Sequence, residues 1–94
     1  MSLPPNATND EDPGLKQFLA EEVRVGAYAD LLLERAEAAQ RGEAPPAASG
    51  NAYYVTFGPA EIVIEHHYLE NWPAKRLSYS RFLVALRAWR KQLI

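Results

Sequence analysis

Apolar residues recur at spacings of three and four from Leu15 to Arg41, which is the period of one face of an α-helix. The positions that share this face are Leu15, Phe18, Leu19, Val23, Val25, Tyr28, Leu32, Ala36 and Ala39. Gly26 lies inside the stretch and costs roughly 1 kcal/mol relative to Ala in a helix interior. The pattern is therefore compatible with one long helix or with two helices broken near Val23 to Gly26. Gly42 is expected to end this helical half.

A linker of Pro, Ser, Gly and Ala residues at 43–51 separates the helical half from a stretch rich in β-forming residues. Residues 53–57 are aromatic or β-branched and predict a strand, residues 58–60 have the composition of a turn, and residues 61–68 alternate as a second strand. Together they predict a hairpin. Alternation assigns one face of the second strand, toward the core, to Ile62, Ile64, His66 and Tyr68, and the other face to Glu61, Val63, Glu65 and His67.

The C-terminal segment predicts an amphipathic helix that Ser78 or Ser80 caps and that runs to about Leu93. Its apolar stripe consists of Tyr79, Phe82, Leu86, Trp89 and Leu93, and the rest of its surface carries Arg81, Arg87, Arg90 and Lys91. An isolated hairpin is marginally stable, so both helical segments are expected to pack on one face of a small antiparallel sheet. The predicted fold class is α+β, with the hairpin packed against an N-terminal helix or helix pair and the C-terminal amphipathic helix.

Composition adds bounds on domain organisation and location. Residues 1–14 mix Pro, Asn, Asp and Glu and predict a disordered lead-in, which leaves residues 15–94 for a single α+β domain. The chain has no Cys, which excludes disulfides and thiolate metal sites. No stretch approaches the roughly 20 apolar residues that cross a bilayer, and the N-terminus does not resemble an export signal. We therefore expect a cytoplasmic protein without a membrane partner.

The charges are distributed in two opposed poles. Residues 1–70 carry all twelve acidic residues and four basic ones, a net charge of −8, whereas residues 71–94 carry six basic residues and no acid, a net charge of +6. Such asymmetry is typical of a protein with a charged partner or of one that associates with itself.

Catalytic and metal-binding patterns are missing from the sequence. His66 and His67 are consecutive, so on a strand their side chains leave opposite faces and cannot readily chelate one metal ion. We expect His66 to pack partly in the core with one hydrogen-bond partner and His67 to be solvated. Glu61 and Glu65 share a strand face but nothing marks a cleft, and the chain lacks a glycine-rich phosphate loop, a nucleophile elbow and a Cys nucleophile. The sequence therefore predicts no enzyme activity, catalytic residue, metal or cofactor.

Three acids of the first helical half lie close together on the helical wheel. Asp30, Glu34 and Glu37 fall within about 60° of one another, opposite the apolar stripe. Asp30 and Glu34 form a like-charged i,i+4 pair, so an acidic surface is tolerated where mixed charge would be more favourable. The simple interpretation is a solvated helix face, and the functional alternative is a docking surface for a basic protein.

The basic C-terminal segment has a nucleic-acid interpretation as well. Lys75, Arg76 and Arg81 lie near Trp72 and Tyr79, and basic residues interleaved with aromatic ones can bind phosphates and stack on bases. The chain as a whole is acidic, which opposes approach to a polyanion. Weak nucleic-acid binding is thus kept as an alternative, and nucleic acid is not the favoured partner.

A set of segments in the C-terminal half forms a recognisable pattern: Gly50–Val55, Glu61–Glu65, Leu77–Ser78, Phe82–Leu86, Trp89 and Leu93. On these residues the C-terminal half resembles small bacterial immunity proteins of polymorphic or contact-dependent toxin systems. In that family a Gly-Asn lead enters a hairpin, and a last helix follows with a Phe, Leu and Trp pattern. The resemblance implies binding without catalysis, with a toxic domain such as a nuclease as the partner. It carries over residues of the fold only.

The partner-binding candidates follow from charge and exposure. Toxic nucleases have basic clefts for phosphates, so an acidic surface could steer association and block substrate. The candidates are Asp30, Glu34 and Glu37 first, then Glu61, Glu65 and His67, with Tyr68, Glu70 and Trp72 as possible anchors. Trp72 has a structural alternative as a loop aromatic that caps the core. The alternative partner is a second copy of the chain, joined through the opposed charged poles.

Overall fold

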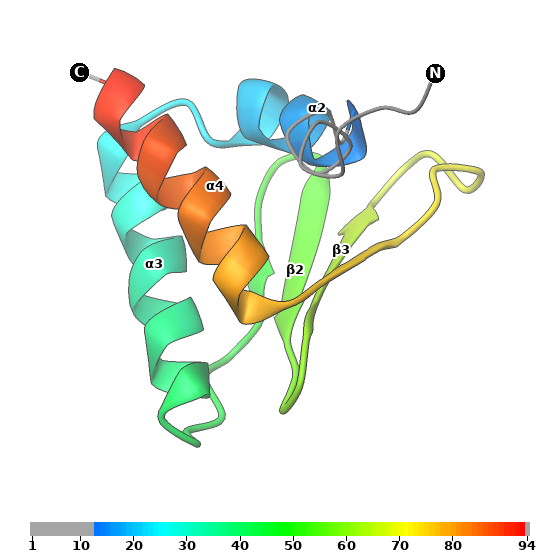
Figure 1. The fold of residues 1–94 in the computed structure, drawn as a ribbon. Helices are drawn as coiled ribbons and strands as arrows, with labels where there is room; N and C mark the ends of the chain where they lie inside the picture. The colour runs from blue at the N-terminus through cyan, green and yellow to red at the C-terminus, as the bar shows by residue number, and fades with distance from the viewer. Residues whose placement is uncertain (1–12, 94) are drawn as a thin grey trace, which may run out of the picture.

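The structure is a computed structural model that describes residues 13–93, and Figure 1 shows their arrangement. The elements in chain order are α2 (Pro13–Glu22), α3 (Gly26–Gln40), β1 (Ala48–Ser49), β2 (Tyr53–Phe57), β3 (Ile62–His66), β4 (Lys75–Leu77) and α4 (Tyr79–Gln92). The predicted α+β class is confirmed. The lead-in expected at residues 1–14 lies outside the described residues, except that Pro13 and Gly14 belong to α2.

The helical half consists of two helices. Residues 23–25 separate α2 from α3, and Val25 has the extended backbone of a residue before a helix. Val23 is fully buried at this break, and its carbonyl oxygen accepts a hydrogen bond of 2.6 Å from the indole Nε1 of Trp89. Trp89 of α4 therefore supplies the hydrogen-bond donor for a backbone carbonyl at the break between α2 and α3. Gly42 follows α3 with φ of 92°, a conformation that favours glycine, and ends the helical half as expected.

The four strands form one antiparallel sheet in the order β1-β2-β3-β4. The predicted hairpin is its centre, with Val55 opposite Ile64 and Phe57 opposite Ile62. Two short strands extend it, β1 beside β2 and β4 beside β3. Strand β3 ends at His66, so Tyr68 lies in the following loop with 74% of its surface exposed. The prediction that Tyr68 faces the core is wrong because alternation does not continue past the end of the strand.

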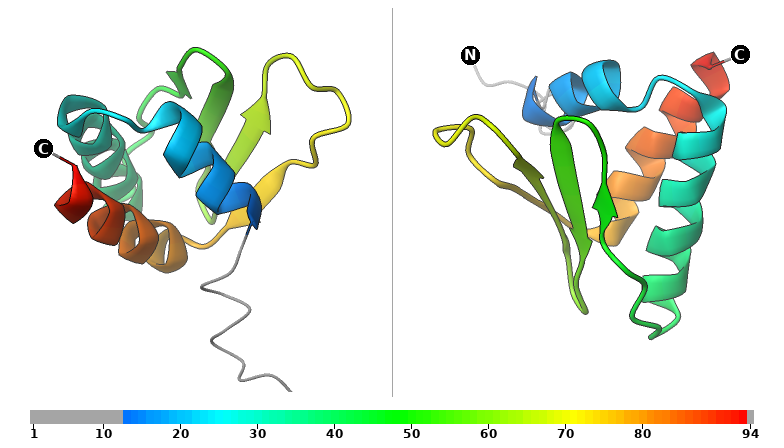
Figure 2. Two further views of the ribbon diagram at one scale, coloured as in Figure 1. Left: turned by 90° about the horizontal axis from the view of Figure 1, so that it is seen from above. Right: turned by 180° about the vertical axis from the view of Figure 1, so that it is seen from behind.

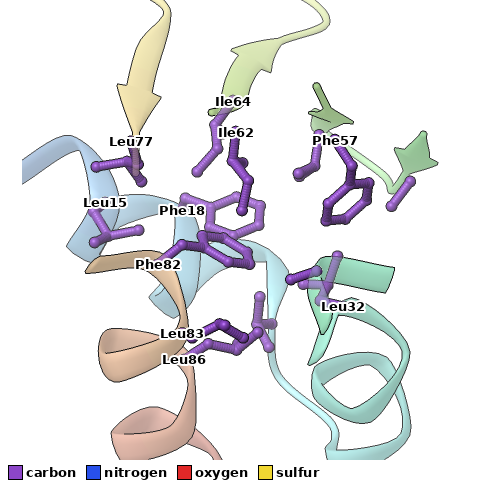
Figure 3. Packing of buried hydrophobic residues seen from close by; sticks show 14 of the residues in the cluster. Leu15, Phe18, Leu32, Phe57, Ile62, Ile64, Leu77, Phe82, Leu83 and Leu86 are labelled. Carbon is purple, nitrogen blue, oxygen red and sulfur yellow. The ribbon is translucent and has the colours of Figure 1, made fainter. Parts of the chain in front are cut away.

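The helices lie on one side of the sheet, and no element of the described chain covers the other side (Figure 2). Alternate residues of β2 and β3 are buried beneath the helices, and Phe82 of α4 lies beside the side chains of Phe18 and Ile62 (Figure 3). The fully buried large side chains are Tyr53, Phe18, Phe82, Leu32, Ile62, Ile64, Leu86, Val23 and Val55. Because these side chains pack between the helices and one side of the sheet, the uncovered side of the sheet points away from the helices. No helix formed by residues 13–93 has the length and apolarity required to cross a membrane.

Helix α4 begins after one of the two residues predicted as its N-cap. The hydroxyl oxygen of Ser78 accepts a hydrogen bond from the backbone N–H of Arg81 at 3.3 Å, so Ser78 and not Ser80 is the N-cap. Tyr79, Phe82 and Leu86 of the predicted stripe are buried, and Trp89 is half-buried. The helix therefore docks by its aromatic side, as expected.

The turn between β1 and β2 is joined to α2 through a carboxylate. Oε1 of Glu22 accepts the backbone N–H of Ala52 at 3.2 Å, while Oε2 is buried without a hydrogen-bond partner among the described residues. A Cβ atom added to Gly50 would lie 1.4 Å from Oε2 of Glu22. The neighbouring Glu21 accepts the hydroxyl of Tyr53 at 2.7 Å, and burial together with this carboxylate raises the pKa of Tyr53. Two adjacent glutamates thus hold the hairpin against the first helix.

We expect Gly50→Ala to destabilise the protein by about 1–3 kcal/mol, since the new methyl group would displace the Glu22 carboxylate from the N–H of Ala52. In a Glu22→Ala background the same change should be neutral or slightly stabilising, because the clash is absent. Urea unfolding of the four proteins of this double-mutant cycle measures the coupling. Equal effects of Gly50→Ala in the two backgrounds would refute the role assigned to Glu22.

Candidate functional site

The acidic face of α3 meets the basic face of α4 within the molecule. Oδ1 of Asp30 lies 2.9 Å from Nε of Arg90, and Oε2 of Glu37 lies 2.9 Å from Nη2 of Arg87. The Asp30 carboxylate also raises the pKa of Arg90 through its hydrogen bond and its charge. Two of the three acids proposed as the first docking surface therefore have basic partners, and only Glu34 remains exposed without one in the described part of the chain.

We expect Glu37→Arg to lower the melting temperature by about 2–6 °C at low salt, because it places two cations where Glu37 and Arg87 now pair. The double variant Glu37→Arg with Arg87→Glu should recover most of this loss. The pair is about half exposed, so 1 M salt should diminish both effects. The measurement is thermal unfolding of the wild type, of Glu37→Arg and of the double variant. A double variant no more stable than Glu37→Arg alone would contradict the pairing.

The uncovered side of the sheet forms a second surface, which we call the outer face. The cross-strand register places Ser49, Tyr54 and Glu65 in one row and Thr56, Val63 and Arg76 in the next. Glu61 also belongs to this side, where its carboxylate forms an ion pair with Arg76. The structure thus places Glu61 and Glu65 on the side that strand alternation predicts, although Glu61 is already neutralised.

Exposed aromatic and apolar side chains gather where the outer face meets the loop between β3 and β4. The rings of Tyr54 and His67 have centroids 6.0 Å apart, and those of His67 and Tyr68 are 5.9 Å apart. Tyr54 is 37% exposed and Leu69, which follows Tyr68, is 47% exposed. His67 is exposed as expected, with its Nε2 3.1 Å from the hydroxyl oxygen of Ser49. The structure therefore brings together the candidate strand-face residue His67 and the candidate anchor Tyr68.

The loop that contains Tyr68 packs against aromatic rings at the edge of the core. His66 is half-buried with its ring centroid 4.7 Å from that of Tyr53, and its Nδ1 accepts the backbone N–H groups of Tyr68 and Leu69, each at 3.1 Å. The expectation that His66 packs partly in the core is confirmed, with two hydrogen-bond donors instead of one.

Trp72 closes the same cluster from the far end of the loop. Its ring centroid lies 5.4 Å from that of Tyr53, and its Nε1 donates to Oε1 of Gln17 at 3.2 Å. Trp72 is half-buried, so the geometry favours the core-capping interpretation over a role as an exposed anchor. Phe18, whose ring contacts Tyr53, continues this packing into the core.

Two carboxylates accompany the exposed aromatic residues. Among residues 13–93, Glu34, Glu65 and Glu70 form neither an ion pair nor a side-chain hydrogen bond. Glu65 lies on the outer face and Glu70 in the loop after Tyr68, and both are exposed. Acidic charge without an internal partner therefore lies beside the exposed rings, and on α3 it is reduced to Glu34.

We call the combined surface the binding face, and it consists of Tyr54, Glu65, His67, Tyr68, Leu69 and Glu70. Sequence reasoning found four of these residues and missed Tyr54 and Leu69. The signal for Tyr54 was present, because alternation that buries Tyr53 and Val55 must turn Tyr54 outward. Leu69 carried no such signal, because its exposure depends on the conformation of the loop.

The aromatic residues near the basic segment are turned inward. Tyr79 is buried and its hydroxyl donates to the carbonyl oxygen of Gly58, while Trp72 packs against Tyr53. Arg76 is paired with Glu61. The two aromatic residues that the nucleic-acid alternative invokes thus pack in or against the core, and one of its cations is paired.

The described residues contain no group of three or more His, Cys, Asp or Glu side chains that could hold a metal ion. Comparison of the chain with protein-family models, with curated proteins and with solved structures found no match.

Proposed function

We propose that this protein is a non-catalytic binding protein that docks a basic protein domain on its binding face. The observation that carries the proposal is the exposure of Tyr54, Tyr68 and Leu69 beside the unpaired carboxylates of Glu65 and Glu70. Large exposed rings supply buried area on association, and carboxylates at the margin attract a cationic surface and orient it.

The more specific form of the proposal is an inhibitor of a toxic nuclease domain, which the resemblance of the C-terminal half to immunity proteins favours. A nuclease cleft is basic because it binds phosphates, so an acidic and aromatic surface seated over it would exclude the substrate. The chain needs no chemistry of its own for such a function. Its rigid sheet would supply a preformed surface with little ordering cost on binding.

Self-association through the charged poles receives less support. Asp30 and Glu37 already pair with Arg90 and Arg87, and Glu61 pairs with Arg76, so these charges are satisfied within one chain. A second copy would have to compete with these internal partners. The same pairs join part of the acidic pole to part of the basic pole within one chain.

Capture from lysate of the source organism tests the proposal when three baits are compared. The baits are the wild type, the variant Glu65→Lys with Glu70→Lys, and the control Glu34→Lys, which changes the unpaired acid of α3. We expect the wild type and the control to retain the same basic domain in stoichiometric amount and the double variant to lose it. Co-expression should then show that the wild type, and not the double variant, suppresses the toxicity of that domain. Equal capture by all three baits, or no stoichiometric protein, would contradict the proposal.

A further inference from the structure

His66 connects the buried aromatic cluster with the exposed loop of the binding face. One side of its ring packs against Tyr53, with the centroids 4.7 Å apart, and lies 6.2 Å from the ring of Trp72. Its Nδ1 accepts the backbone N–H groups of Tyr68 and Leu69, both at 3.1 Å. The two residues with the largest exposed apolar surface in the loop are therefore positioned by one nitrogen atom.

This arrangement requires the neutral imidazole. An acceptor needs a free lone pair, so the proton of the neutral ring resides on Nε2. The imidazolium carries N–H groups on both nitrogens, and the new N–H at Nδ1 would face two other donors. Protonation thus replaces two hydrogen bonds by repulsion between donors, and the loop must move away from the ring.

Within residues 13–93, no carboxylate offers the cation a compensating ion pair. On the helix side of the sheet the titratable and charged groups of the neighbouring elements are Tyr53 of β2, Lys16, Glu21 and Glu22 of α2 and Lys75 of β4, and the loop adds Tyr68 and Glu70. Glu21 accepts the Tyr53 hydroxyl and Glu22 accepts the Ala52 N–H. No described carboxylate lies in an ion pair with His66.

We propose that His66 is an acid-sensitive positioning residue, whose neutral ring holds Tyr68 and Leu69 in the binding arrangement and whose protonation releases them. The loop is then ordered at neutral pH and opens on acidification, while the sheet and helices remain folded. The consequence for a partner rests on the proposed function: a protein that docks on the binding face at neutral pH would dissociate in acid.

Substitutions of His66 can separate the effect of its hydrogen-bond acceptor on the loop from the effect of its aromatic ring. His66→Asn retains an acceptor, since an Asn side chain commonly accepts backbone N–H groups two and three residues ahead, and it does not titrate. His66→Phe retains an aromatic ring for Tyr53 and Trp72 but has no acceptor. His67→Gln is the matched control, because it removes the other histidine and leaves the contacts of Nδ1 unchanged.

The test is the amide-exchange protection factor of Tyr68 and Leu69 in the free protein, measured across the pH interval in which NMR shows His66 to titrate. We expect the wild type and His67→Gln to lose about tenfold in protection as His66 becomes protonated. His66→Asn should remain protected throughout, and His66→Phe should be unprotected at every pH. The amides of Val55 and Ile64, which lie in the central hairpin, report that the fold persists.

Unchanged protection of the wild-type loop with His66 protonated, or full protection in His66→Phe at neutral pH, would overturn the proposal. Partner affinity is measured separately, with the domain captured by the wild-type bait. Acid should weaken its binding to the wild type and not to His66→Asn. A loop that opens as predicted without loss of affinity would contradict only the role of the loop in binding.

Discussion

Phe82→Ala is expected to lower the free energy of unfolding by about 3–5 kcal/mol, the usual cost of emptying a buried aromatic site. Phe82 is fully buried on α4 and lies beside Phe18 of α2 and Ile62 of β3 (Figure 3), so its removal opens a cavity where three elements meet. Native proteins of this size have only about 5–15 kcal/mol to lose. Much of the stability should disappear, and the midpoint of urea unfolding should fall accordingly.

Val84→Ala on the same helix supplies the control. Val84 is 68% exposed, so its truncation removes little buried surface and should change the unfolding free energy by less than about 0.5 kcal/mol. A comparable loss for the two substitutions would mean that α4 does not pack by the side that contains Phe82.

Tyr68→Ala is expected to weaken binding of the captured domain by about 30-fold, or roughly 2 kcal/mol, mainly through faster dissociation. Tyr68 is the most exposed aromatic residue of the binding face at 74%, and its backbone is held by His66. Stability of the free protein should hardly change, because the side chain is not part of the core. Binding kinetics on a surface that carries the captured domain, recorded at one salt concentration, give both the association rate and the dissociation rate.

The variant Glu65→Lys with Glu70→Lys should instead slow association, and the difference from wild type should shrink as salt is added. Glu34→Lys changes charge by the same amount per site on α3 and should leave the association rate nearly unchanged. A normal dissociation rate for Tyr68→Ala, together with equal sensitivity to Glu34→Lys, would move the interface away from the outer face.

The elements with strong periodicity could be predicted from the sequence. The hairpin and the amphipathic α4 follow from local patterns that agree with the tertiary packing, and the sequence narrows the cap of α4 to Ser78 or Ser80, of which the structure shows Ser78. Strands β1 and β4 could not be recognised, since they have two and three residues and exist only because the hairpin offers its edges. The choice between one and two N-terminal helices likewise depends on a distant residue, because Trp89 binds the carbonyl at the break.

The candidate site was only partly predictable for a similar reason. Helical spacing grouped Asp30, Glu34 and Glu37 correctly on one face of α3. Spacing within one helix cannot show that Arg87 and Arg90, some 50 to 60 residues later, neutralise two of these acids. Charge asymmetry along a sequence therefore does not translate directly into charged surfaces. In this chain Asp30, Glu37 and Glu61 pair with three of the six basic residues of the C-terminal pole. The unpaired Glu65 and Glu70 therefore become the more informative acids.

Carboxyl labelling of the captured complex tests the central claim most directly, because Glu34, Glu65 and Glu70 are the described carboxylates without an internal partner. A water-soluble carbodiimide and an amine label these groups, and mass spectrometry compares each site in the free and bound protein. We predict that Glu65 and Glu70 lose labelling in the complex while Glu34 reacts as in the free chain. Protection of Glu34 with unchanged labelling of Glu65 and Glu70 would place the partner on α3 and contradict the account.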